Sequence, residues 1–142
     1  MARTLEAKVG ITASAFDLLH GGHIAMLAEA KTQCDYLICC LQVDPSMERK
    51  NKNKPAQNIV ERYIQLDSVK YVDEIIPYVT ERDLLDILML KKPDVRVIGE
   101  EYRDIQFTGK NLNIEIYYNS RQHLFSTSAL RKKIAKSESV DG

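Results

Sequence analysis

The stretch ASAFDLLHGGHIAML (residues 13–27) follows an apolar run, leads into a helical pattern, and decides how the rest of the chain is interpreted. It holds His20 and His23, two of the three histidines in the protein, on either side of Gly21 and Gly22. The pattern predicts a turn from a strand into a helix. The first N–H groups of such a helix have no internal partner, so the turn is suited to bind an anion.

Apolar, β-branched segments alternate with helical patterns on both sides of this turn. We expect strands within residues 7–14, 35–43, 72–78, 93–100 and 112–119, and helices within residues 24–33, 58–70, 81–92 and 126–136. Strands separated by helices form right-handed βαβ units. The sequence therefore predicts an α/β fold with a mostly parallel five-stranded sheet.

Only the segment DPSMERKNKNKPAQ (residues 44–57) interrupts this alternation. Charge runs are usually solvated loops. This loop, however, leaves the carboxyl edge of the sheet, where open α/β folds bind ligands. Two interpretations of Lys50, Lys52 and Lys54 therefore stay open: a mobile lid over an anionic ligand, or a solvated loop.

The length and composition limit the possible classes of protein. The 142 residues predict a single domain, 1–142, with a flexible tail over residues 137–142. Twenty basic residues balance 20 acidic ones, and no apolar segment is long enough for a membrane span. We therefore expect a cytoplasmic protein without nucleic-acid or membrane partners.

The cysteines lack zinc-site spacing, so packing in or beside a strand is expected for Cys34, Cys39 and Cys40.

The paired histidines carry the main functional signal. Gly21 and Gly22 let a phosphate approach the backbone without a Cβ in the way. Imidazoles at His20 and His23 would flank that phosphate with N–H donors, which suits the charge that builds up in a phosphoryl transition state. The alternative is structural: one histidine caps the helix, and the other hydrogen-bonds in the core.

Four segments in order resemble a known family, the cytidylyltransferase-type nucleotidyltransferases. FDLLHGGHIAML (residues 16–27) carries their H-x-G-H signature, and YVDEIIPY (71–78) is similar to their YVDEVI segment. VRVIGEEY (95–102) resembles their fourth strand and loop, and SRQHLFSTSALRKKI (120–134) their closing arginine and I-S-T-T helix start. The glycerol-3-phosphate cytidylyltransferases are the most similar. The resemblance implies a Rossmann-like three-layer α/β/α fold, a homodimer, Mg²⁺ as cofactor, and CTP and a small phosphorylated substrate as partners.

The resemblance also implies roles for single residues. The catalytic residues would be His20, His23, Arg121, Lys50, Lys52 and Lys54. The nucleotide would be bound by Ala15, Phe16, Asp17, Gly22, Lys70, Gly99, Glu100, Ser126 and Thr127, with Asp17 also near the metal. The acceptor would be bound by Arg62, Gln122 and His123. Structural alternatives are a plain helix cap for Ser126, a surface position for Glu100, and an ion pair with Glu61 for Arg62.

The sequence departs from the family pattern at three places. Ser14-Ala15 replaces the usual G-T before F-D, and Lys70 replaces an arginine, which keeps the charge but loses the planar fork. RQHLFSTS (residues 121–128) replaces R-T-E-G-I-S-T-T. We therefore expect phosphate handling to be retained, whereas the acceptor and the nucleotide preference stay open.

The implied chemistry is attack by a phosphomonoester oxygen on the α-phosphorus of a nucleoside triphosphate, with release of pyrophosphate. The sequence has no P-loop, G-x-G-x-x-G or G-x-S-x-G pattern that would favour another chemistry. Three hypotheses stay open. They are a CTP-dependent cytidylyltransferase for a glycerol 3-phosphate-like acceptor, an ATP-dependent adenylyltransferase acting on a sugar phosphate, and a nucleotide-binding domain without catalysis.

Overall fold

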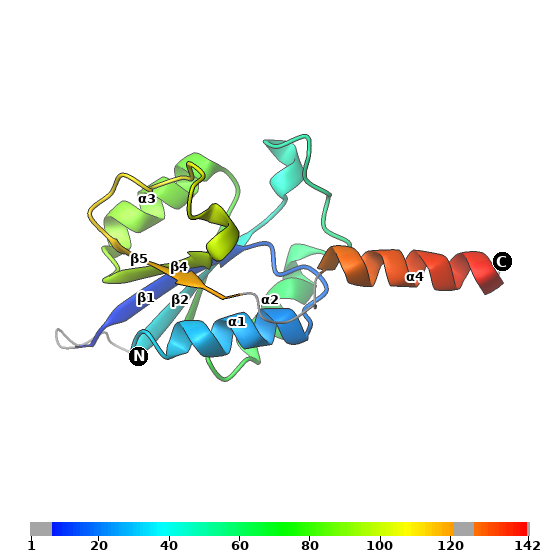
Figure 1. Cartoon of the computed structure of the whole chain (residues 1–142), viewed down its shortest axis with the longest axis horizontal. Helices are drawn as coiled ribbons and strands as arrows, with labels where there is room; N and C mark the ends of the chain where they lie inside the picture. The colour runs from blue at the N-terminus through cyan, green and yellow to red at the C-terminus, as the bar shows by residue number, and fades with distance from the viewer. Residues whose placement is uncertain (1–6, 121–126, 142) are drawn as a thin grey trace.

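A computed structural model describes residues 7–120 and 127–141, without the side chains of residues 139–141. Every strand and helix expected from the sequence is present in this part of the chain (Figure 1). The strands are β1 (Val9–Ser14), β2 (Tyr36–Gln42), β3 (Glu74–Tyr78), β4 (Val95–Gly99) and β5 (Glu115–Asn119). The helices are α1 (Gly21–Lys31), α2 (Ile59–Asp67), α3 (Glu81–Lys91) and α4 (Thr127–Asp141), with short 3₁₀ turns η1 (Pro45–Met47) and η2 (Glu100–Tyr102).

The five strands form one sheet in the order β3-β2-β1-β4-β5, and every neighbouring pair is parallel. The chain builds β1, β2 and β3 outward in one direction and then crosses back to place β4 on the other side of β1. The strand order therefore reverses between β1 and β4. In open parallel sheets, ligands bind at the carboxyl ends of the strands beside such a reversal.

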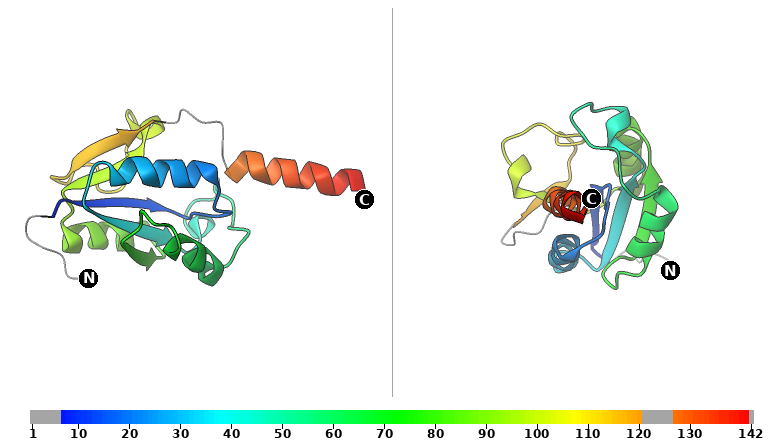
Figure 2. Two further views of the ribbon diagram at one scale, coloured as in Figure 1. Left: turned by 90° about the horizontal axis from the view of Figure 1, so that it is seen from below. Right: turned by 90° about the vertical axis from the view of Figure 1, so that its right-hand side faces the viewer.

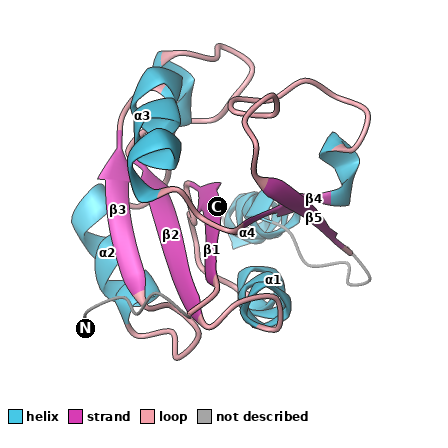
Figure 3. Ribbon diagram, turned by 90° about the vertical axis from the view of Figure 1, so that its left-hand side faces the viewer, coloured by secondary structure: helices cyan, strands magenta, loops and turns pink. Residues whose placement is uncertain are grey.

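The helices cover both faces of the sheet, as Figure 3 shows. Leu27 of α1 and Leu66 of α2 belong to a buried cluster with Leu37 of β2. Leu88 of α3 belongs to the cluster on the opposite face, with Ile38 of β2. Successive side chains of a strand point to opposite faces, so β2 supplies both clusters. This arrangement confirms the predicted Rossmann-like three-layer fold, with a sheet that is entirely parallel.

The cysteines are packing residues, as expected. All three are free thiols, with Cys39 and Cys40 buried in β2 and Cys34 half-buried just before it. Burial raises the pKa of the Cys40 thiol to about 12. A thiol with so high a pKa carries almost no thiolate at neutral pH and is therefore a poor nucleophile.

The last helix, α4, projects from the body of the molecule (Figures 1 and 2). It runs through Asp141, so the backbone of residues 137–141, where the sequence predicts a flexible tail, is helical. Side chains 132–138 are exposed. In the described ranges, none of the helices is both long and apolar enough to cross a membrane.

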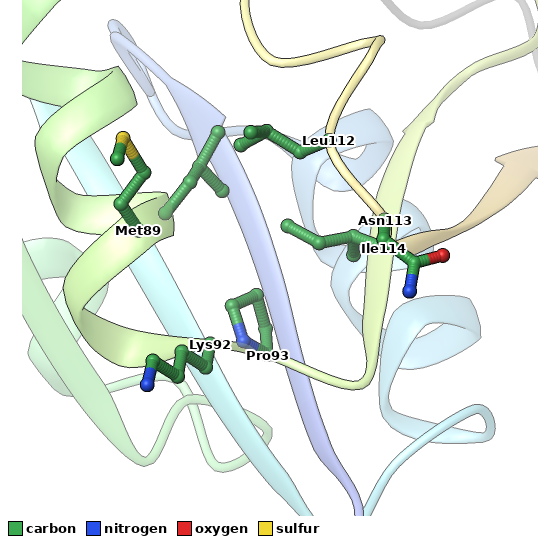
Figure 4. A pocket seen from close by; sticks show the side chains of 7 residues that line it. Met89, Lys92, Pro93, Leu112, Asn113 and Ile114 are labelled. Carbon is green, nitrogen blue, oxygen red and sulfur yellow. The ribbon is translucent and has the colours of Figure 1, made fainter.

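A shallow pocket lies between the end of α3 and the connection from β4 to β5 (Figure 4). Its lining is mostly apolar and includes Met89, Pro93, Leu112 and Ile114, with Lys92 and Asn113 at its rim. Pro93 precedes β4 and Ile114 precedes β5, so the pocket lies at the amino edge of the sheet. It is therefore not the ligand site that the strand order predicts.

The close packing of β1 on the end of α1 gives a testable prediction. A Cβ at Gly10 would lie 2.7 Å from Cys34 Sγ. We expect Gly10→Ala to lower the free energy of unfolding by about 1–3 kcal/mol, as overpacking does. In a Cys34→Ala background the same change should cost less, because the sulfur is gone. Denaturant unfolding of the four proteins tests this, and an equal cost in both backgrounds would contradict it.

Candidate active site

The site is built around the first turn of α1, at the carboxyl end of β1. His20 is the N-cap of α1, and its Nδ1 accepts the N–H of Gly22 at 2.9 Å. His23 Nδ1 accepts the N–H of His20 at 3.2 Å, which completes a reciprocal capping box. The structural interpretation of the histidines is therefore correct for the Nδ1 atoms, since both rings cap this helix.

The capping bonds also decide which nitrogen of each ring carries the proton. A ring nitrogen that accepts a hydrogen bond is unprotonated, so in the neutral imidazole the proton is on Nε2. His20 Nε2 therefore donates to Thr127 Oγ1, 3.1 Å away. His23 keeps its Nε2–H for another acceptor, and none is found for it among residues 7–120 and 127–141. Both rings are thus fixed as Nε2–H donors.

The two rings are stacked, with centroids 4.1 Å apart. Burial and, to a smaller extent, the neighbouring His20 lower the pKa of His23 to about 4, against a smaller opposing effect of Asp17. His23 is therefore neutral at pH 7. It can hydrogen-bond a phosphate but adds no positive charge to the site.

Asp17 fixes the loop that leads into α1. Its carboxylate accepts the N–H groups of Ala56 (2.8 Å) and Gln57 (3.0 Å) from the loop between β2 and α2. It also forms an ion pair with Arg131 of α4. Burial alone would raise the pKa of Asp17, but the two N–H donors and the Arg131 guanidinium outweigh it, and the pKa lies below its ordinary value. Asp17 therefore joins three segments as a carboxylate.

The backbone on either side of Asp17 adopts a rare conformation. Phe16 has φ 48° and Leu18 has φ 52°, in the left-handed region that non-glycine residues seldom enter. Gln57 Oε1 accepts the N–H of Leu18 at 2.8 Å. The loop is thus held in this conformation by two sets of hydrogen bonds, one made by the Leu18 N–H and the other by the Asp17 side chain.

The first turn of α4 lies beside the first turn of α1 (Figure 2). Thr127 Oγ1 receives the His20 Nε2–H and donates to the carbonyl of Asp17 at 3.1 Å. Arg131, one turn later, also donates to the carbonyl of Lys54 at 3.2 Å. Thr127 therefore lies beside His20, and its contact with a nucleotide stays a prediction. The sequence interpretation did not include Arg131, which pairs with Asp17.

Arg62 is not available to bind an acceptor, contrary to the sequence-based prediction. Its side chain is 2% exposed. Its guanidinium donates to four backbone carbonyls, those of Gln57 (3.0 Å), Ala15 (3.0 Å), Gln42 (2.6 Å) and Val43 (2.5 Å). These bonds tie the ends of β1 and β2 to the start of α2. The alternative of an exposed ion pair with Glu61 is therefore wrong as well.

Lys70 is also far from the expected position. It follows α2 and precedes β3, and its Nζ lies 5.2 Å from the centre of the Tyr71 ring. A residue just before a parallel strand lies at the amino edge of the sheet. Within one chain, Lys70 therefore cannot contact a nucleotide at the carboxyl edge, and that prediction is corrected.

The other predicted residues fall into three groups. The structure places five at the carboxyl edge or in loops leaving it: the exposed Lys50, Lys52 and Lys54 after β2, and Gly99 and Glu100 at the end of β4. Gly22 is buried in the first turn of α1, and Ala15 and Phe16 lie in the loop before it. Four predicted residues lie outside the described part of the chain: Arg121, Gln122, His123 and Ser126.

Asp17 does not fit the predicted role of metal ligand. Its side chain is 7% exposed, and three donors already occupy its two oxygens. Within residues 7–120 and 127–141, no group of three or more His, Cys, Asp or Glu side chains could hold a metal ion. Mg²⁺ at nucleotide sites is commonly held through substrate phosphates. Mg²⁺ therefore stays a prediction and is not assigned to Asp17.

The fold is an open parallel sheet with the imidazole-capped N-terminus of α1 at its carboxyl edge, which is where α/β folds of this kind bind their ligands. Residues 11–137 match the family model described as Cytidylyltransferase-like. The chain belongs to this cytidylyltransferase-like family and is a nucleotidyltransferase-type domain.

Similar proteins include several named Bifunctional protein HldE. The one from Gluconacetobacter diazotrophicus is 35% identical over 74% of this chain, and the one from Campylobacter jejuni (strain RM1221) is 32% identical over 91%. The chain spans only 22% and 28% of the length of these two relatives.

Two solved structures share the fold. A lipopolysaccharide core biosynthesis protein from Thermoplasma volcanium GSS1 has a TM-score of 0.59 at 24% identity, covering 93% of this chain and 89% of its own. A pantoate-beta-alanine ligase from Francisella tularensis has a TM-score of 0.65 at 18% identity, with 92% and 67% coverage. At these identities the likeness shows the fold alone.

The low pKa of His23 predicts a pH dependence of stability. The pKa is about 4 in the folded chain and about 6.5 in an unfolded one. Between these values only the unfolded state takes up the proton, so the contribution is complete above about pH 6.5 and is lost as the pH falls toward 4. From pH 7 to pH 5 the wild type should lose about 1–2 kcal/mol more than His23→Asn, which keeps an acceptor for the His20 N–H. Parallel slopes in urea titrations would contradict this.

The Asp17 carboxylate accepts hydrogen bonds from backbone N–H groups and pairs with the Arg131 guanidinium. We expect substitutions that remove these two kinds of contact to have different effects. Asp17→Asn turns an amide N–H toward backbone donors, so the free energy of unfolding should fall by about 2–3 kcal/mol. Arg131→Gln removes the partly exposed ion pair and the bond to the Lys54 carbonyl, and should cost less than about 1 kcal/mol. It should nevertheless speed tryptic cleavage at Lys132 and Lys133, because α4 loses its side-chain attachment to Asp17. Equal unfolding costs, or unchanged cleavage in Arg131→Gln, would contradict the assignment.

Proposed function

We propose that this domain transfers a nucleotidyl group from a nucleoside triphosphate to a small phosphorylated acceptor. An oxygen of the acceptor phosphate forms a bond to the α-phosphorus, the bond from that phosphorus to the oxygen bridging to the β-phosphate breaks, and pyrophosphate leaves. No covalent enzyme intermediate is required, because an ionised phosphate is itself the nucleophile. The protein then needs to align two anions and stabilise the charge that develops between them.

One observation carries the proposal: the two imidazoles at the start of α1 are fixed as Nε2–H donors before any ligand arrives. Their Nδ1 atoms are held by backbone N–H groups at 2.9 and 3.2 Å. Donors that are already oriented need no reorganisation as charge builds on the phosphate. The Nε2–H of His23 would bind the triphosphate directly, and His20, now bonded to Thr127, would act beside it.

Positive charge must come from other residues, because His23 is neutral. Lys50, Lys52 and Lys54 lie in the loop after β2, which leaves the carboxyl edge of the sheet. In this proposal they contact the phosphates of the nucleotide or of the acceptor. Arg121 would sit over the reacting phosphates, and Mg²⁺, held by those phosphates, would neutralise part of their charge.

The donor and acceptor are proposed from the relatives. The likeness to the HldE proteins favours ATP as donor and a sugar phosphate as acceptor over the CTP and glycerol 3-phosphate expected from the sequence motifs. The cytidylyltransferase hypothesis stays the second candidate, because the family model that matches is cytidylyltransferase-like.

A cytoplasmic location and a homodimer also stay proposals. Val60 and Ile64 on the outer face of α2 are 64% and 65% exposed, and sedimentation would show whether a second copy covers them.

The activity test is pyrophosphate release with Mg²⁺, offering ATP or CTP with sugar 1-phosphates and glycerol 3-phosphate. We expect turnover with ATP and a sugar phosphate. His20→Asn should lower kcat about 10²–10³-fold, because it removes the Nε2–H donor. Asparagine is also a strong N-cap, so the melting temperature should change little and serves as the control. Full activity in both His20→Asn and His23→Asn would exclude the catalytic assignment.

A further inference from the structure

A second polar cluster lies at the carboxyl edge of the sheet, on the face that α3 covers and not on the face that α1 covers. It consists of Gln42, the last residue of β2, Arg49 in the loop that follows, and Glu81, the first residue of α3. Arg49 Nη2 lies 3.4 Å from Gln42 Oε1 and 3.4 Å from Glu81 Oε1. Thr108 Oγ1 donates to Glu81 Oε2 at 3.0 Å. The cluster therefore connects β2, α3 and the β4–β5 connection.

Two donors in this cluster have no acceptor. Gln42 Nε2 and Arg49 Nε are both buried, and no hydrogen-bond partner for either lies in the described part of the chain. Gln42 itself is 3% exposed. Its amide oxygen faces Arg49, which leaves the amide nitrogen as the unused group. Buried donors without acceptors are rare and destabilising, so two in one network indicate that a ligand supplies the acceptors.

The charge of the cluster indicates the kind of ligand. The Arg49 guanidinium is paired with Glu81, and the Glu81 N–H donates to Glu48 Oε2 at 2.8 Å. Positive charge is therefore balanced here, unlike in the neighbouring lysine-rich loop. An amide N–H, a guanidinium N–H and a carboxylate together suit hydroxyl groups, which both donate and accept hydrogen bonds. A phosphate would be repelled by the two carboxylates.

The cluster lies next to the H-x-G-H turn. Arg62 Nη1 bonds to both the Ala15 carbonyl and the Gln42 carbonyl, at 3.0 and 2.6 Å. The loop that leads to His20 and the end of β2 are therefore fixed side by side. We propose that Gln42 and Arg49 form the subsite that binds the hydroxyl groups of the sugar part of the acceptor. This inference rests on the proposed function, since it assigns part of the acceptor site.

The test is the substitution Gln42→Leu, which removes the donor and keeps a similar volume. The KM for the best sugar phosphate among mannose 1-phosphate and glucose 1-phosphate should rise about tenfold, while the KM for ATP changes less than about twofold. The melting temperature without ligand should stay equal or rise, because an unpaired buried donor is gone. Arg49→Gln, at a half-exposed position, should raise the same KM and serves if Gln42→Leu folds poorly.

Gln65→Leu is the matched control. Gln65 Oε1 is also buried without a partner among the described residues, but it lies on α2 toward the amino edge of the sheet. It should leave the acceptor KM unchanged. Ethyl phosphate, which lacks hydroxyl groups, is the matched ligand and should bind the wild type and Gln42→Leu alike.

Calorimetric binding without nucleotide separates this inference from the proposed function. One outcome is that no turnover is seen but a sugar phosphate binds the wild type at least tenfold more tightly than it binds Gln42→Leu. This outcome would support the subsite and refute the proposed function. Turnover with an unchanged acceptor KM in both variants would overturn the subsite and leave the function standing. The subsite is also overturned if neither sugar phosphate binds the wild type, or if ethyl phosphate loses affinity equally.

Discussion

The buried carboxylate of Asp17 is the constraint on which the rest of the site depends. A carboxylate removed from water must be matched by donors, and here they come from Ala56, Gln57 and Arg131, on two segments far from each other in the sequence. The carbonyl of the same residue holds Thr127. These bonds fix the flanking backbone at positive φ, which would not persist without them. They also determine where His20 begins α1.

Each of the two histidines has one ring nitrogen that stabilises the fold and one that the proposed function assigns to the ligand. In each ring, Nδ1 completes the helix cap and Nε2 is left as a donor, which in His20 is bonded to Thr127. The structural interpretation of the H-x-G-H motif is therefore correct for the Nδ1 atoms, and the functional interpretation stays a proposal for the Nε2 atoms. Because the caps form when the helix forms, the rings are oriented by folding and not by substrate. Because the low pKa of His23 keeps this donor neutral, the proposed function assigns the positive charge to Lys50, Lys52, Lys54 and Arg121.

Much of the fold was predictable because strand and helix periodicity are local properties of the sequence. The alternation of apolar runs located all five strands, and the H-x-G-H motif located the turn at which α1 begins. Arg62 was misplaced because arginine is usually exposed. Its spacing from Ile59 and Leu66 nevertheless puts it on the apolar face of α2, and that signal was available. Lys70 was misplaced by analogy with the family, although its position before a parallel strand already assigns it to the amino edge.

The remaining residues could not be predicted because their partners are distant in the sequence. No local pattern connects Arg131 with Asp17, 114 residues earlier, or Arg49 with Glu81. Those separations also bear on the order of folding. Contacts between residues so far apart require closure of a long loop and tend to form late. The turn after β1 is among the first parts of this domain to be synthesised, yet it lacks its last two attachments until α4 has been made. Nascent chains that end before α4 would therefore contain the histidine motif without the bonds that Thr127 and Arg131 make to it.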